Sequence, residues 1–163
     1  MRLKRTREVL QQFGKYVVTQ SRSALTKKKK TLSGSLYDSL QYIVEDTEDG
    51  IKVSFNMNDY GKFVDKGISG KEEKHNTPYS FTNKKPPMKP LMEWAKARRF
   101  RLRDEKGRYE KGNYKTIGFI LQNSIYKKGI KPSLFFTRPF NLAYERFGDD
   151  VVKAFLKDID ELL

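Results

Sequence analysis

The 163-residue sequence contains no cysteine, and this absence removes several classes of protein at once. Without a thiol there is no disulfide framework, no thiolate nucleophile and no cysteine-based metal site. A single histidine, His75, leaves little from which to build a histidine metal cluster or a Ser-His relay. No apolar run approaches the roughly 18 residues that a membrane span needs, and the basic N-terminal stretch lacks the apolar core of a secretory signal. We therefore expect a chain that begins in a cytoplasm and has no membrane partner.

Positive charge is what the sequence has in excess. It carries 34 Lys and Arg against 20 Asp and Glu, for a formal net charge of +14. The excess is uneven, because residues 1–30 and 84–111 are strongly basic whereas residues 31–83 hold more acids than bases. Such asymmetry predicts a polyanionic partner or an acidic protein face.

The hydrophobic pattern predicts an α+β fold. Apolar residues recur at helical spacing along residues 3–25 and again from Phe140 to the end, which predicts an N-terminal and a C-terminal helix. The runs QYIVEDT and IKVSFNMN flank Asp49-Gly50, and this pairing of a turn with alternating residues predicts a β-hairpin over 41–58. We expect a small antiparallel sheet packed by the two terminal helices.

A mostly helical insertion is expected at approximately 71–129, inside a single domain that spans 1–163. Residues 71–85 show no period and predict a mobile loop. Pro90 is well placed to open one helix, and Gly129 is placed to end another.

Catalytic patterns are weak in this sequence. His75 lies in a polar loop and is interpreted as a surface residue. Asp104-Glu105-Lys106 has the acid-x-Lys spacing of metal-dependent nucleases, but it lies in an unbroken charged run, which favours a solvated turn. We expect no catalytic, cofactor-binding or metal-ligating residue, and no cofactor.

Two basic segments are candidate interaction sites. Three interpretations remain open for them: binding of nucleic-acid phosphates, a solvated face, and contact with an acidic neighbouring subunit. The second segment also contains Phe100 and Tyr109. The basic residues proposed to face DNA or a partner are Lys27, Lys28, Lys29, Lys30, Arg98, Arg99, Arg101 and Arg103.

Aromatic residues gather between two prolines near the start of the last helix. Phe135, Phe136 and Phe140 lie close to Pro132 and Pro139. Aromatic side chains in such a setting usually pack into the core, and burial in a subunit contact is the alternative.

Three short motifs resemble those of a known family. The first is Leu36-Tyr37-Asp38-Ser39-Leu40, which leads into the hairpin. The second is the run 60–69, Tyr-Gly-Lys-Phe-Val-Asp-Lys-Gly-Ile-Ser, and the third is the run 132–140, Pro-Ser-Leu-Phe-Phe-Thr-Arg-Pro-Phe. In order and spacing they resemble the head–tail joining, or tail-completion, proteins of tailed bacteriophages.

Three features depart from the family pattern. Asp65 stands where Glu is usual, and Ile68 precedes Ser69 where Gly-Thr is normally contiguous. The insertion at 71–129 makes this chain an enlarged version. The motif residues that the resemblance marks as structural are Tyr60, Phe63, Val64, Asp65, Gly67, Pro132, Phe135, Phe136 and Pro139.

The resemblance implies a non-enzymatic structural protein of the virion neck, present in the host cytoplasm during assembly. It implies a ring of six or twelve copies at the head–tail interface, around the channel that DNA crosses, between a portal-side connector ring and tail proteins. Arms at 26–35 and 71–89 would reach neighbouring subunits. Because a ring multiplies the charge of each copy, we expect a basic segment to line the channel or to dock on an acidic neighbour.

Two other functions remain as alternatives. A cytoplasmic protein that binds nucleic acid nonspecifically would use the basic segments to contact phosphates. A small nuclease or RNA-cleaving toxin would depend on Asp104 and Lys106.

Overall fold

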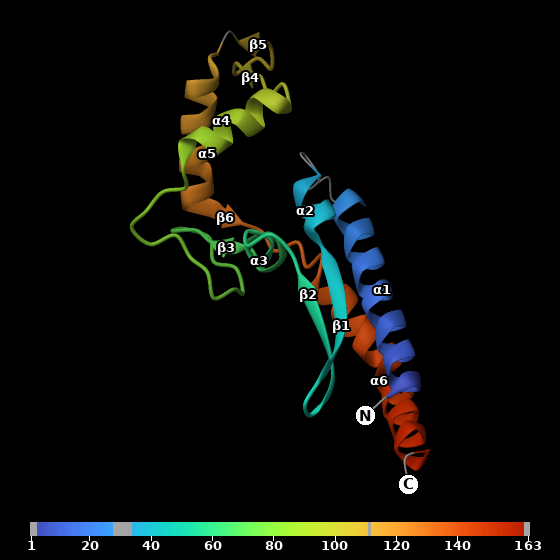
Figure 1. Ribbon diagram of the computed structural model, residues 1–163. Coiled ribbons are helices and arrows are strands. Elements are labelled where there is room, and N and C mark those ends of the chain that lie inside the picture. Colours follow the sequence, from blue (N-terminus) through green and yellow to red (C-terminus); the bar gives the residue numbers. More distant parts are fainter. Residues whose placement is uncertain (1–2, 28–33, 111, 162–163) are drawn as a thin grey trace. The chain divides into compact units, whose positions relative to one another are not determined.

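The computed structural model of the chain in Figure 1 describes residues 3–27, 34–110 and 112–161. The chain combines helices and strands, and a small antiparallel hairpin is flanked by the N- and C-terminal helices. This confirms the predicted α+β class. The chain divides into two compact units, one formed by residues up to Gly61 together with those from Leu134 onward, the other by Lys62–Ser133. The single domain over 1–163 stays a prediction. Of the predicted Lys27–Lys30 cluster, Lys28, Lys29 and Lys30 lie outside the described residues.

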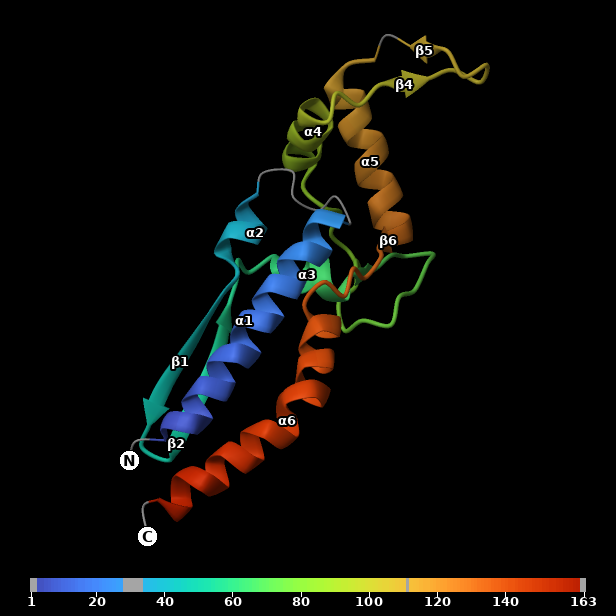
Figure 2. The same ribbon diagram turned by 90° about the vertical axis from the view of Figure 1, so that its right-hand side faces the viewer.

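The first unit contains the predicted hairpin and terminal helices. The start of α1 lies beside the end of α6, so the two long helices run antiparallel, and α1 also packs on the hairpin (Figure 2). Its elements are α1 (Lys4–Lys27), α2 (Ser35–Ser39), β1 (Gln41–Thr47), β2 (Gly50–Asn56) and α6 (Thr137–Asp160).

An aromatic cluster forms the core of this unit. Phe13 on α1 is buried and meets three other phenylalanine rings edge-on, with centroid distances of 6.0, 5.7 and 6.3 Å. These rings come from β2 and α6, so one side chain joins the three elements and stabilises their packing. The three partners are Phe55, Phe140 and Phe147.

The hairpin matches its prediction. Thr47 pairs with Gly50, which leaves Glu48 and Asp49 as a two-residue loop. Gly50 has φ of 148°, a conformation that side-chain-bearing residues rarely adopt, so the glycine after the acid is needed here.

The second unit is built from short strands and two packed helices. Strands β3 and β6 pair antiparallel, β4 pairs with β5, and α4 packs on α5. Its elements are α3 (Gly61–Lys66, whose first residue belongs to the first unit), β3 (Ile68–Ser69), α4 (Met88–Ala97), β4 (Leu102–Arg103), β5 (Tyr109–Glu110), α5 (Tyr114–Lys128) and β6 (Gly129–Ile130).

Two predicted helix starts were wrong by two or three residues. Helix α4 begins at Met88 rather than at Pro90, and α6 begins at Thr137 rather than at Phe140. Pro90 and Pro139 are therefore third residues of their helices. A proline is tolerated there because the N–H groups of the first turn have no acceptor within the helix. The predicted end of α5 at Gly129 is confirmed, with φ of 76° at that glycine.

The loop at 71–85 has no helix, as predicted, but it is fastened to β3. The Ser69 hydroxyl accepts a hydrogen bond from the His75 N–H and donates one to the His75 carbonyl, each at 3.0 Å. The backbone of Ser69 also bonds to Tyr79 and Phe81. These bonds hold the middle of the loop segment against one strand.

Candidate functional site

The second and third family-like motifs meet at a backbone crossing in the Lys62–Ser133 unit. Ile68 pairs with Ile130, and the Ser133 N–H and hydroxyl both donate to the Val64 carbonyl, at 3.1 and 2.6 Å. A Cβ added to Gly67 would lie 2.7 Å from the Pro132 nitrogen. Residues almost seventy apart in the sequence are therefore held together by strand pairing and by a close approach that only glycine permits.

The other residues of the second motif have different environments. Asp65 is buried and Tyr60 is 44% exposed. The Phe63 ring packs edge-on against Tyr79, with centroids 4.6 Å apart. A Cβ added to Gly61, at the start of α3, would lie 2.5 Å from Met57 Sδ and 2.9 Å from Leu36 Cδ1, so these two side chains would have to shift.

The aromatic residues of the third motif are core residues, as predicted. Phe135 is fully buried and Pro139 is buried in the first turn of α6. Phe136 and Phe140 pack against Phe55 at 5.4 and 5.9 Å. The proposed structural role of this motif thus agrees with its position.

The predicted arginine segment forms one surface, which we call the arginine tip. It lies where α4 ends and the β4–β5 hairpin begins (Figure 2). A depression of about 510 Å³ is lined by its arginines together with Phe100 and Tyr109. The three aromatic side chains of the tip are partly exposed: Trp94 is 37% exposed, Phe100 is 42% exposed and Tyr109 is 63% exposed. The arginine tip consists of Trp94, Phe100 and Tyr109 together with Arg98, Arg99, Arg101 and Arg103.

Aromatic rings hold most of the guanidinium groups of the tip. Arg103 lies 4.6 Å from the Tyr109 ring centroid and Arg101 lies 5.6 Å from it, while Arg98 lies 5.7 Å from Trp94. Arg103 also donates to the Tyr109 hydroxyl at 3.0 Å. Two cations on one ring repel each other, so the arrangement favours an anion that contacts both.

The backbone of Arg99 is strained. The Phe100 N–H bonds to the Ala95 carbonyl at 2.8 Å and the Arg99 N–H bonds to the Lys96 carbonyl at 3.0 Å, which is the Schellman pattern for ending a helix. In this pattern the residue after the helix has a left-handed conformation and is usually glycine. Here it is Arg99, with φ of 50°. A non-glycine residue there costs about 1–2 kcal/mol, so the backbone at Arg99 lowers the stability of this helix end.

The acid-x-Lys pattern forms a turn. One Asp104 carboxylate oxygen accepts from the Lys106 and Arg108 N–H groups at 3.0 and 2.8 Å, and the other accepts from the Arg108 side chain at 3.1 Å. The carboxylate is thus used to close the β4–β5 loop around Gly107. His75 Nε2 lies 3.0 Å from the Lys128 carbonyl oxygen, in a contact near the molecular surface.

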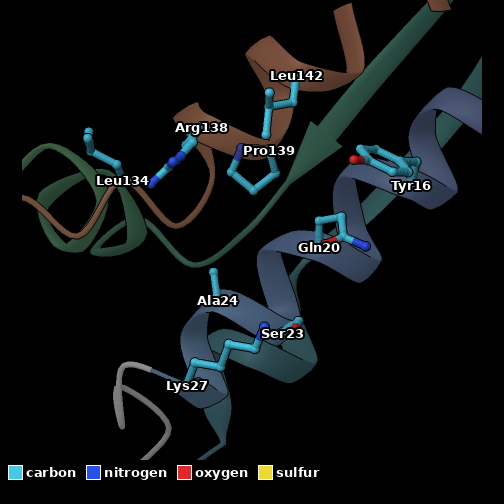
Figure 3. A pocket seen from close by; sticks show the side chains of 9 residues that line it. All are labelled: Tyr16, Gln20, Ser23, Ala24, Lys27, Leu134, Arg138, Pro139 and Leu142. Carbon is cyan, nitrogen blue, oxygen red and sulfur yellow. The ribbon is translucent and has the colours of Figure 1, made fainter. Parts of the chain in front are cut away.

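Lys27, the described member of the lysine run, lines a groove between α1 and the start of α6 (Figure 3). The groove has a volume of about 230 Å³, and Arg138 contributes a second cation on its other wall. No acid belongs to its lining. Leu134, at its edge, has φ of 52°. The lining residues are Tyr16, Gln20, Ser23, Ala24, Lys27, Leu134, Arg138, Pro139 and Leu142.

A second depression was not predicted from the sequence. It lies in the first unit at the end of the β1–β2 hairpin, with a volume of about 600 Å³, and we call it the hairpin hollow. Three acids and two apolar side chains line it. Its residues are Leu3, Asp46, Thr47, Glu48, Asp49, Gly50 and Phe155.

Within residues 3–27, 34–110 and 112–161, no group of three or more His, Asp or Glu side chains could hold a metal ion. Over the same residues no helix is long and apolar enough to cross a membrane. Comparison of the chain with family models, with curated proteins and with solved structures gave no match.

Proposed function

We propose that this chain is a non-enzymatic structural protein of a tailed bacteriophage, which forms a ring of six or twelve copies around the DNA channel at the head–tail interface. The backbone crossing at Gly67 carries the proposal. It brings the run 60–69 and the start of the run 132–140 together, with β3 on β6 and Ser133 on Val64. Two motifs that resemble one family by sequence thus act as one structural element.

The exposed apolar side chains of α6 give further support. Five large residues on this helix are between 42 and 68% exposed. Association with neighbours would bury these side chains, and burial of apolar area is the main favourable contribution to assembly. The five residues are Leu142, Tyr144, Val152, Phe155 and Leu156.

Electron microscopy and light scattering of the purified chain test the ring. We expect closed rings with an open centre and a mass of six or twelve copies of 19.1 kDa. Mass spectrometry of tailed particles purified from the source of the gene is expected to detect this chain as a virion component. Its absence from such particles would contradict the proposal.

The alternative function is nonspecific nucleic-acid binding, and the arginine tip favours it. Four arginines gathered on one surface could neutralise the phosphates of a nucleic-acid backbone. Filter binding over a range of salt concentrations tests this function. If the tip contacts phosphates, Arg101→Ala makes the negative slope of log K against log salt less steep by about 0.7 to 0.9. The control is Lys153→Ala, an exposed residue of α6, which should leave the slope unchanged.

A further inference from the structure

We propose that the arginine tip of one copy docks in the hairpin hollow of a second copy. The inference rests on the proposed ring and names one of its contacts between copies. The tip lies wholly in the Lys62–Ser133 unit and the hollow lies wholly in the other unit. One chain therefore carries both halves of a head-to-tail contact, which is the kind of contact that closes a ring.

The hairpin hollow has the chemistry to receive the tip. Its rim holds Asp46, Glu48 and Asp49 and no basic residue, while Leu3 and Phe155 supply apolar surface. Phe155 is 42% exposed, so part of its ring is available to a partner. Arg7 pairs with Asp46 at 2.6 Å, which leaves Glu48 and Asp49 as the acids of the rim without an ion pair among the described residues.

The arginine tip offers the complementary groups. Within the described chain, no ion pair joins Arg99 or Arg101 to an acid. Guanidinium groups contact carboxylates through two parallel hydrogen bonds, and the exposed Phe100 can cover apolar surface at the same time. The strained backbone of Arg99 places a cation at the edge of this surface. Arginines and aromatic rings are the residues most enriched at the centres of protein interfaces.

A protein partner fits the tip better than a nucleic acid does. Binding of single strands depends on bases that stack on open aromatic faces. Here Arg101 and Arg103 lie over the Tyr109 ring and Arg98 lies over Trp94, so these rings position cations. A contact between the tip and the acids of the hollow also offsets part of the +14 charge that each copy brings to a ring.

Disulfide trapping tests the contact directly, because the natural chain has no cysteine. Arg101→Cys and Glu48→Cys are prepared as separate chains, mixed and oxidised. We expect a covalent dimer that contains one chain of each kind, in at least tenfold excess over the dimer formed when Glu145→Cys replaces Glu48→Cys. Glu145 is an exposed acid on α6 outside the hollow and is the matched control.

Charge variants test the energetics of the same contact. Arg101→Glu and Glu48→Lys, each alone, are expected to weaken association at least tenfold in light scattering, and a mixture of the two variants to recover it. Arg99→Gly is the control for folding, since it removes a cation and relieves the left-handed strain. We expect this variant to melt at a higher temperature and yet to associate more weakly.

Several outcomes would overturn the docking contact. They are the absence of the mixed disulfide, a disulfide formed only when both cysteines are on one chain, and unchanged association of both charge variants. Tight binding of single-stranded DNA lost in Arg101→Glu, without a mixed disulfide, would assign the tip to nucleic acid instead. Rings without the mixed disulfide would leave the proposed function intact, and a mixed disulfide without rings would contradict the proposed function alone.

Discussion

Gly67→Ala is expected to lower the free energy of unfolding of the Lys62–Ser133 unit by about 3 kcal/mol or more. Gly67 has φ of 73°, where a side chain costs about 1–2 kcal/mol. The added Cβ would also lie 2.7 Å from the Pro132 nitrogen, 2.9 Å from its Cδ, and against the Ile130 carbonyl oxygen. These atoms cannot move apart without weakening the β3–β6 pair. Urea unfolding followed by the fluorescence of Trp94, the single tryptophan of the chain and part of this unit, measures the loss.

Gly107→Ala is the matched control for this prediction. Gly107 belongs to the same unit and has φ of 77°, but nothing lies within 4 Å of an added Cβ. An alanine at this position has the unfavourable left-handed backbone but no steric clash. We therefore expect the free energy of unfolding to fall by only about 1 kcal/mol. Equal losses for the two variants would show that close approach at the crossing is unimportant.

The elements predicted correctly are those with a local signal. Alternating residues and Asp49-Gly50 predict the hairpin, and helical spacing predicts α1 and α6. The strands β3 and β6 have two residues each, too few for any period to show. Gly129 was interpreted only as the end of a helix and Gly67 only as a motif residue, whereas each also permits the backbone approach at the crossing. That second role depends on what lies opposite, which a single sequence does not specify.

The candidate surfaces were predicted in part for the same reason. Basic composition identifies the arginine segment, but the stacking of Arg101 and Arg103 on Tyr109 requires the β4–β5 turn to bring them together. The hairpin hollow combines Leu3 with Phe155, from opposite ends of the chain. The acid-rich run at 45–49 was visible in the sequence, and placed at a hairpin end it could have indicated a contact surface.

Asp158 is the buried acid that sequence reasoning missed. It lies near the end of α6 and is 3% exposed, yet it caps the start of α1. Its carboxylate accepts hydrogen bonds from the Arg5 N–H at 3.1 Å, the Thr6 N–H at 2.8 Å and the Thr6 hydroxyl at 2.8 Å. Capping residues are normally sought just before a helix, and this one is 152 residues away from Thr6. Because α1 and α6 pack along each other, the cap also fixes their register.

Asp158→Ala is expected to destabilise the first unit by about 2 kcal/mol, since it leaves two N–H groups of the first turn without their acceptor. The far-ultraviolet circular dichroism of the helices follows the loss during thermal unfolding. Asp160→Asn, an exposed acid two residues further along α6, is the control and is expected to change stability little.

The same carboxylate gives the stability a defined pH dependence. Burial by itself raises the pKa of Asp158, but the hydrogen bonds from Thr6 and Arg5 outweigh it and hold this pKa below the ordinary value. A group whose pKa is lower in the folded state stabilises the fold above its unfolded pKa, about 3.9, and loses that contribution as the pH falls through the folded pKa. The wild type should therefore exceed Asp158→Asn in melting temperature at neutral pH, and the difference should shrink on acidification to about pH 2–3.

Glu161, whose pKa is lowered through its hydrogen bond with Arg5, is present in both chains and does not account for the difference. A gap between the two melting temperatures that stayed constant from neutral to acid pH would show that the charge of Asp158 does not stabilise the cap.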